Sequence, residues 1–158
     1  MQREITTYLS QLVQNLKLPI ASVTVLAPER TFWEKVTLIH VSCNRQKFSE
    51  NPSRQSRHWY DVAMMYQDEV GGSAIEKKEL LADVVKLKKV FYNAAGANYD
   101  FCLENKFKLI PSKDTLSALK NDYQKMIAEN MFYDDRFLSF DEIINTMQKL
   151  ENYLNDKV

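Results

Sequence analysis

Residues 28–45 read PERTFWEKVTLIHVSCNR, and this stretch decides the fold. Pro28 suits the first turn of a helix because its missing N–H would be unpaired there anyway, and Glu29 complements the positive helix N-terminus. We predict a helix to about Arg45, with Lys35 near its middle among bulky aromatic and aliphatic side chains. A charge in such surroundings is costly unless it is paired or used. Lys35 is therefore a candidate functional residue.

A second polar cluster, RHWYD at residues 57–61, lies in a further helix that we predict over residues 55–68. This cluster places Asp61 beside Trp59 and Tyr60, so the same cost applies to its carboxylate. Lys35 and Asp61 are therefore the two charges for which the sequence demands an explanation.

The remaining sequence predicts a mainly α protein. Only three glycines occur in 158 residues and the four prolines fall between periodic segments, which favours long helices with short connections. Hydrophobic spacing, alternation and capping boxes predict a helix over residues 5–16, a strand over 20–26, and helices over 73–91, over 116–127 and from 139 onward. We therefore expect a single helical domain over residues 1–158, a bundle of about six helices with one short β-strand.

The predicted helix over residues 73–91 rests on two signals. Gly71-Gly72 is expected to break the chain, and Ser73 and Glu76 form a capping box that opens the helix. Its expected buried stripe is Leu80, Leu81, Val84, Leu87, Val90 and Phe91.

Composition bounds the class of protein. The chain has 45% hydrophobic residues, enough for an ordinary core, and 21 basic residues balance 21 acidic ones. This balance lacks the electrostatic footprint of a dedicated nucleic-acid binder. Cys43 and Cys102 match no metal spacing and are expected to be buried free thiols. Neither a signal peptide nor a membrane span is apparent, so we expect a cytoplasmic protein without a membrane partner.

Several segments in order carry a family resemblance. They are ERTFWEKVTLIH at residues 29–40, RQSRHWYD at 54–61, ANYD at 97–100, LIP at 109–111, Asp122-Tyr123 with Met126, and SFDEII at 139–144. Together they resemble the C-terminal half of the AbiEii/AbiGii nucleotidyltransferase toxins, which are bacterial enzymes associated with abortive phage infection and type IV toxin–antitoxin pairs.

The resemblance implies catalytic roles for Lys35 and Asp61. Lys35 matches the lysine that is implied to contact nucleotide phosphates, and Asp61 matches an aspartate implied to complete the catalytic carboxylates or to orient that lysine. An ammonium suits the first role because it is a compact charge on a flexible stem. A buried salt bridge between two helices is the alternative. Both hold if the pair rests as a salt bridge and rearranges when nucleotide binds.

The neighbouring polar residues leave alternatives open. Arg57 precedes Asp61 by four positions, which fits an ion pair on one helix face or bidentate phosphate recognition. His58 and Asp61 have a spacing that suits a metal, but the chain assembles no convincing set of ligands, so no metal site is predicted. Arg45, His40 and His58 are candidates to line the same cleft as Lys35, with Arg45 and His58 as nucleotide-binding residues.

Two further groups have a functional and a structural interpretation. Arg45, Lys47, Arg54 and Arg57 form either a basic rim that receives an RNA backbone or a solvated loop. Phe32, Trp33, Trp59 and Tyr60 stack on a base or, as their helical spacing favours, belong to the core.

One family motif is missing from the sequence. The family carries a Gly-Ser turn followed by Asp-x-Asp carboxylates that hold metal ions, and Gly71-Gly72-Ser73 imitates only the turn, since Asp83-Val84-Val85 lacks the second aspartate. We therefore expect a fragment or truncated form without the N-terminal metal-binding half, inactive alone and without a cofactor of its own. The complete enzyme is implied to use Mg²⁺ and a nucleoside triphosphate, and to transfer the nucleotide to RNA or another acceptor.

The alternative function is a non-catalytic helical module that binds an antitoxin or copies of itself. A truncated scaffold is expected to expose apolar side chains where the missing half would pack, and such patches promote association. The residues expected to be exposed are Ile5, Leu9, Leu12 and Val23 or Val25. Self-association is therefore expected under either function.

Overall fold

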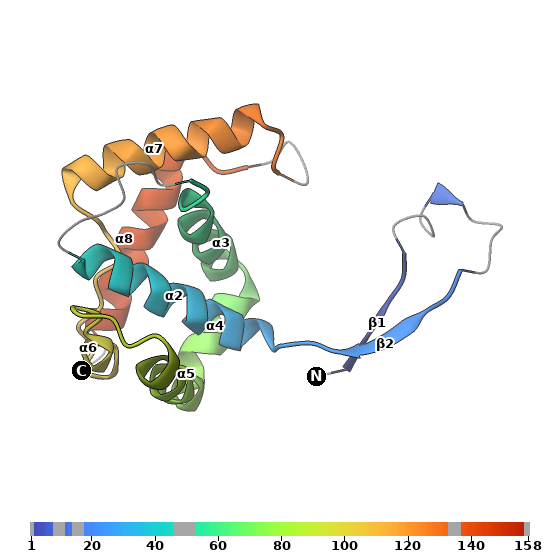
Figure 1. Ribbon diagram of the computed structural model, residues 1–158, viewed down its shortest axis with the longest axis horizontal. Helices are drawn as coiled ribbons and strands as arrows, with labels where there is room; N and C mark the ends of the chain where they lie inside the picture. Colours follow the sequence, from blue (N-terminus) through green and yellow to red (C-terminus); the bar gives the residue numbers. More distant parts are fainter. Residues whose placement is uncertain (1, 8–11, 14–17, 46–52, 133–136, 157–158) are drawn as a thin grey trace.

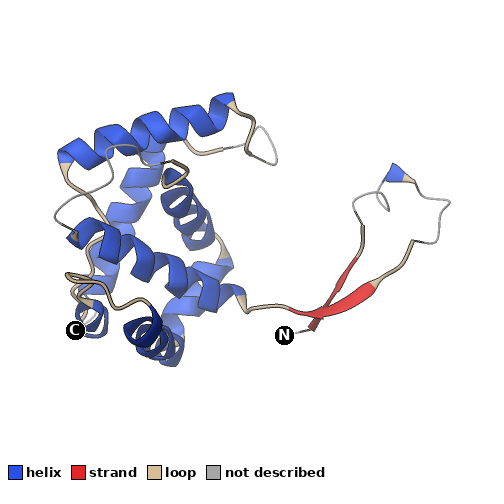
Figure 2. Ribbon diagram, viewed as in Figure 1, coloured by secondary structure: helices blue, strands red, loops and turns tan. Residues whose placement is uncertain are grey.

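The computed structural model describes residues 2–7, 12–13, 18–45, 53–132 and 137–156. These residues form a helical body and a small antiparallel sheet that projects from it (Figures 1 and 2), which confirms the predicted mainly α class. The described elements are β1 (Gln2–Ile5), β2 (Ala21–Thr24), α2 (Pro28–Asn44), α3 (Ser56–Gln67), α4 (Glu69–Glu76), α5 (Lys78–Phe91), α6 (Tyr99–Leu103), α7 (Lys113–Ala128) and α8 (Phe140–Asp156). Every described helix is too short or too polar to cross a lipid bilayer.

The sheet corrects the prediction for the N-terminus. The strand predicted over residues 20–26 is present as β2, but it pairs with β1, where Gln2 lies opposite Thr24 and Ile5 opposite Ala21. Ile5 is thus part of a strand and not the start of a helix. A lone strand leaves its backbone unpaired, and this need outweighed the helical spacing of the side chains. Of the remaining helix positions, Tyr8, Leu9 and Leu16 lie outside the described residues.

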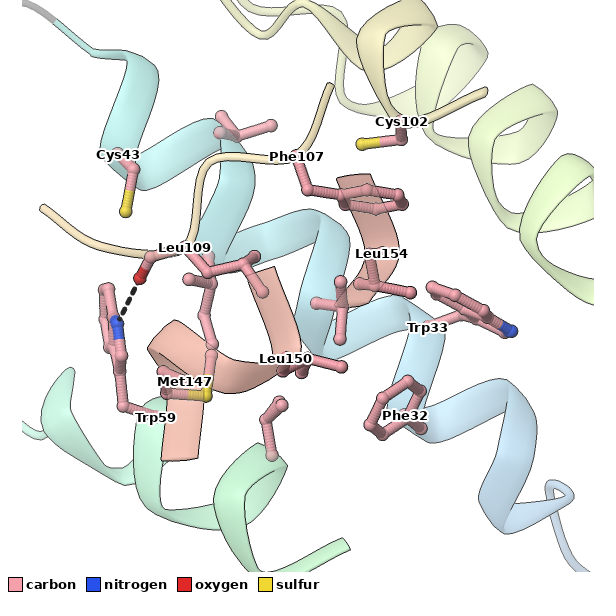
Figure 3. Close-up of a cluster of buried hydrophobic side chains, with 14 of the residues drawn as sticks. Phe32, Trp33, Cys43, Trp59, Cys102, Phe107, Leu109, Met147, Leu150 and Leu154 are labelled. Atoms are coloured by element: carbon pink, nitrogen blue, oxygen red, sulfur yellow. Dashed lines mark hydrogen bonds between the residues drawn. The ribbon is translucent and has the colours of Figure 1, made fainter. Parts of the chain in front are cut away.

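Helix α2 runs through the middle of the body and carries much of the core (Figure 1). Phe32 and Trp33 are buried on it, and the indole Nε1 of Trp33 donates to the carbonyl of Ala74 on α4 at 2.9 Å. Trp59 of α3 is also buried, and its Nε1 donates to the Leu109 carbonyl at 3.0 Å (Figure 3). Each tryptophan therefore joins two segments that are distant in sequence.

The predicted break at Gly71-Gly72 is wrong. Both glycines lie inside α4, and the chain breaks instead at Lys77 between α4 and α5. A Cβ on Gly71 would lie 2.5 Å from the Cα of Tyr66, so glycine lets α4 pack closely against the end of α3. Ser73 is no cap either, because its hydroxyl donates to Glu29 Oε1 at 3.1 Å.

The stripe predicted for α5 is buried only along its first half. Leu81 and Val84 are buried, whereas Val90 and Phe91 are 71% and 70% exposed. The last turn of α5 therefore keeps apolar side chains exposed.

Carboxylates of α7 and α8 cap the starts of α3 and of α8 itself. Asp122 of α7 accepts hydrogen bonds from the backbone N–H groups of Arg54 and Ser56, at 2.7 and 2.8 Å, and from the Ser56 hydroxyl at 2.6 Å. This carboxylate caps the start of α3. The predicted capping box of α8 is confirmed, since Glu142 accepts from the backbone and hydroxyl of Ser139.

Candidate functional site

A cleft of about 960 Å³ opens between α2, α3 and α5. Helix α2 lies with α3 on one side and α5 on the other (Figure 1), and its residues spaced three or four apart form the floor. The ionisable side chains other than tyrosine that line the cleft are Glu34, Lys35, Arg45, His58 and Lys88. Three of these five are cations, Lys35, Arg45 and Lys88, and one is a carboxylate, so the cleft favours an anion.

Lys35 lines this cleft and pairs with Asp61, which is not among the lining residues. The ammonium of Lys35 donates to Asp61 Oδ2 at 2.6 Å, and the two side chains are 24% and 35% exposed. The pair is thus neither sealed in the core nor fully solvated. Because an ammonium has three N–H donors, the bond to Asp61 leaves donors for a ligand. The predicted salt bridge between two helices is confirmed, but it is partly exposed and not buried.

His58 lies one turn before Asp61 and also lines the cleft. Burial lowers the pKa of its imidazole, and the positive charges of Lys35 and Arg57 lower it further. The histidine is therefore neutral at pH 7. Within the described part of the chain, its Nδ1 atom is buried without a hydrogen-bond partner. An unpaired buried nitrogen costs stability, which makes it a feature to explain by ligand binding.

The two predicted nucleotide-binding arginines differ in position. Arg45 lines the cleft just past the end of α2, about 15 Å along the helix axis from Lys35. Arg57 is exposed and does not line the cleft. The predicted ion pair between Arg57 and Asp61 is not among those of the described residues, because Asp61 turns to Lys35 instead.

Lys88 of α5 is a cleft residue that the sequence interpretation missed. Its ammonium donates to the backbone carbonyl of Glu34 at 2.6 Å, and burial lowers its pKa. The overlooked signal is its spacing, since Lys88 follows buried Val84 by four positions and precedes Phe91 by three. A lysine thus occupies a position of the apolar stripe.

Comparison with protein families now assigns this chain. The model of the family described as nucleotidyl transferase AbiEii toxin, type IV TA system, matches residues 1–146. The chain belongs to the AbiEii family. The resemblance to this toxin family is therefore confirmed, and the assignment to its C-terminal half stays a prediction. Comparison with curated proteins gives no match, and comparison with solved structures gives none either.

His40 does not line the cleft of this AbiEii-family chain, contrary to the prediction. It is fully buried, its Nδ1 accepts from the backbone N–H of Lys108 at 3.0 Å, and its Nε2 lies 3.2 Å from the carbonyl of Asn98. These contacts place the proton on Nε2, and burial lowers the pKa of the ring. His40 is a structural residue that holds two loops against α2.

The four aromatic residues considered for base stacking do not line the cleft. Phe32, Trp33 and Trp59 are buried and Tyr60 is partly buried against the same core, which confirms the core interpretation. The aromatic side chains that line the cleft are instead Phe91, Tyr92 and Tyr99. Of the predicted basic rim, Lys47 lies outside the described residues.

The described residues do not fit a magnesium site. No group of three or more His, Cys, Asp or Glu side chains converges within them. The carboxylate nearest in sequence to Lys35, that of Glu34, already accepts from Arg30 Nε at 3.3 Å. A divalent cation prefers several oxygen ligands, and here Asp61 is engaged by an ammonium.

Proposed function

We propose that this chain forms the phosphate-binding wall of a nucleotidyltransferase toxin site. Lys35 contacts the phosphates of a nucleoside triphosphate, and Asp61 orients the ammonium. The observation that carries the proposal is the Lys35–Asp61 ion pair of 2.6 Å beside a largely cationic cleft, in a member of the AbiEii family.

The chemistry of nucleotidyl transfer suits this arrangement. Negative charge develops on the phosphates as the nucleotide moves, and preorganised cations stabilise it. One N–H of Lys35 is held by Asp61 and the others are available for phosphate oxygens. Because the pair is partly exposed, a ligand reaches the lysine without opening the core.

The surrounding residues extend the same role. Arg45 lies farther along the cleft, where it binds a second part of an extended anion, and Arg57 adds a positive charge that acts on His58. His58 is neutral and contributes a hydrogen bond rather than a charge. We propose Lys35, Arg45, Arg57 and His58 as the nucleotide-binding set.

We further propose that the chain does not transfer nucleotides alone. Its sequence lacks the Asp-x-Asp carboxylates that hold metal ions in the family, so the remaining lysine lacks the charge stabilisation that the reaction needs. The proposal is a truncated or C-terminal form whose complete enzyme uses Mg²⁺ and transfers a nucleotide to RNA or another acceptor. Cytoplasmic location fits the two free buried thiols, Cys43 and Cys102.

Calorimetric titration with each nucleoside triphosphate tests the proposal. We expect measurable binding by the wild-type chain and at least about tenfold weaker binding by Lys35→Ala, since a charge-assisted hydrogen bond is lost. Lys120→Ala is the matched control, because Lys120 forms an exposed ion pair with Asp141. Equal affinity of Lys35→Ala and Lys120→Ala would refute the phosphate-binding role.

A second candidate function is protein binding. Ile5 and Leu12 are 51% and 67% exposed, as predicted for an apolar docking surface, whereas Val23 and Val25 are only partly exposed. Family membership suggests an antitoxin as the partner, and a second copy of the chain is the other occupant. Light scattering at increasing concentration separates these: a wild-type dimer that Ile5→Ser and Leu12→Ser dissociate supports self-association, and a monomer throughout excludes it.

A further inference from the structure

We propose that Lys88 is a second phosphate-binding cation, supplied by α5 to the same end of the cleft as Lys35. The proposal rests on the proposed function, because it adds a residue to the same anion site. The structure brings Lys88 beside Lys35 through its hydrogen bond to the backbone of Glu34, the residue that precedes Lys35.

The position of Lys88 is costly for a lysine. Its side chain is half-buried in the cleft next to Val84, which is fully buried, and Leu87. Desolvation disfavours an ammonium in such a place, so a role that needs the charge explains its presence better than packing does.

The charge of Lys88 is compensated only in part, since the Glu34 carboxylate partly offsets the effect of burial on its pKa. Among the described residues Lys88 belongs to no ion pair. By contrast, Lys77 and Lys89, which are near it in sequence, bond to the carboxylates of Glu29 and Asp100. Its ammonium donates to the Glu34 carbonyl, a neutral acceptor. An ammonium with a single neutral acceptor keeps both its charge and its other donors for an anion.

The Glu34 carbonyl does not require Lys88. It lies inside α2, where a helical N–H already donates to it. The contact therefore reads as a resting position for the ammonium. A phosphate oxygen replaces the Glu34 carbonyl as the acceptor of Lys88 at little cost to α2.

Lys88 and Lys35 act on the same neighbour. Both positive charges lower the pKa of His58, which places the three groups in one electrostatic cluster. Two ammonium groups beside one cleft repel each other. Asp61 pairs with Lys35 and Glu34 partly offsets the charge of Lys88, and an anion between the two ammonium groups removes the remaining repulsion. A triphosphate supplies that anion, and the neutral state of His58 avoids a third positive charge.

The test is calorimetric titration of the full chain with inorganic tripolyphosphate. We expect Lys88→Gln to bind about tenfold more weakly than wild type, since the charged hydrogen bond is lost. Lys88→Arg keeps the charge and is expected to retain most of the affinity. Lys86→Gln is the matched control, because Lys86 is exposed on the same helix and does not line the cleft.

The outcomes separate this proposal from the proposed function. If Lys35→Gln weakens binding and Lys88→Gln equals Lys86→Gln, the Lys88 proposal is overturned while the Lys35 site stands. If Lys88→Gln weakens binding and Lys35→Gln does not, the Lys88 proposal stands and the proposed function fails. A purely structural tether predicts that Lys88→Gln lowers the melting temperature without changing tripolyphosphate affinity.

A measurement on the wild-type chain removes dependence on any variant. Tripolyphosphate is expected to protect Lys88 from acylation by an amine-reactive reagent, as read by mass spectrometry, and to leave Lys86 as reactive as before. Equal reactivity of Lys88 with and without tripolyphosphate would overturn the proposal even if Lys88→Gln failed to fold.

Discussion

The histidine in the core and the histidine beside the cleft differ in whether their ring nitrogens have hydrogen-bond partners. On the core side, His40 is fully buried and both ring nitrogens have partners, Lys108 N–H and the Asn98 carbonyl. On the cleft side, His58 leaves its Nδ1 atom without a partner among the described residues. The core histidine is saturated, whereas the histidine beside the cleft keeps one buried ring nitrogen unpaired.

Two aspartates repeat the contrast. Asp122 is buried and accepts three hydrogen bonds at the start of α3. Asp61 lies on that same helix, accepts from Lys35 and stays 35% exposed. The closed network holds α3 in place, so that the open pair is presented to the cleft.

The largest expected effect breaks the contrast between the histidines. His40→Ala should lower the free energy of unfolding by about 3 kcal/mol, because it leaves a buried N–H and a carbonyl unpaired and opens a cavity. His58→Ala should cost about 0.5 kcal/mol or less, since it removes an unsatisfied atom. Urea denaturation measures both free energies of unfolding. Equal losses for the two variants would contradict the difference between the core and the cleft histidine.

The aspartates give the next largest effect. Asp122→Asn should cost about 2 kcal/mol, because the charged hydrogen bonds at the start of α3 are lost. Asp61→Asn should cost about 0.5 kcal/mol, as expected for a partly exposed ion pair. The same urea series checks this, and a larger loss for Asp61→Asn would assign its carboxylate to the fold.

Two adjacent glycines sharpen the distinction between packed and open positions. Gly71→Ala should destabilise by about 1.5 kcal/mol, because its Cβ meets the backbone of Tyr66 and Met65. Gly72→Ala should stabilise by about 0.5 kcal/mol, since nothing lies within 4 Å and alanine favours helix. Thermal melts of the two variants would contradict this if they shifted in the same direction.

The smallest expected effect is the share of His58 in the pH dependence of stability. Burial and the charges of Lys35 and Arg57 lower its pKa in the folded chain below the ordinary 6.5. The unfolded chain therefore binds the proton more tightly, so this contribution is full above pH 6.5 and is lost as the pH falls below it. Unfolding at pH 7.5 and pH 5.5 should show a smaller difference for His58→Gln than for wild type, and an unchanged difference would contradict the shift.

The sequence predicted the elements that local signals specify. Pro28 and Glu29 marked the start of α2, and the Ser139 and Glu142 pair marked the start of α8, because caps act through neighbouring residues. The clusters around Lys35 and Asp61 led to the ion pair, since partly buried charges need partners.

Distant contacts account for what the sequence did not predict. Strand β1 forms because β2 offers it a partner, and α4 continues through Gly71 because the end of α3 lies against it. The role of His40 depends on Asn98 and Lys108, which are far away along the chain. The sequence did not indicate Lys88, because its place in the cleft depends on its contact with the backbone of α2.

The central claim is that the cleft beside α2 binds nucleotide phosphates through Lys35. The most direct test follows the two histidine side chains by NMR as the pH is varied, with and without a nucleoside triphosphate, using His58→Gln to assign the signals. Phosphates that neutralise the nearby cations should raise the pKa of His58 and leave that of His40 unchanged. An unchanged pKa of His58 at saturating nucleotide would contradict the claim.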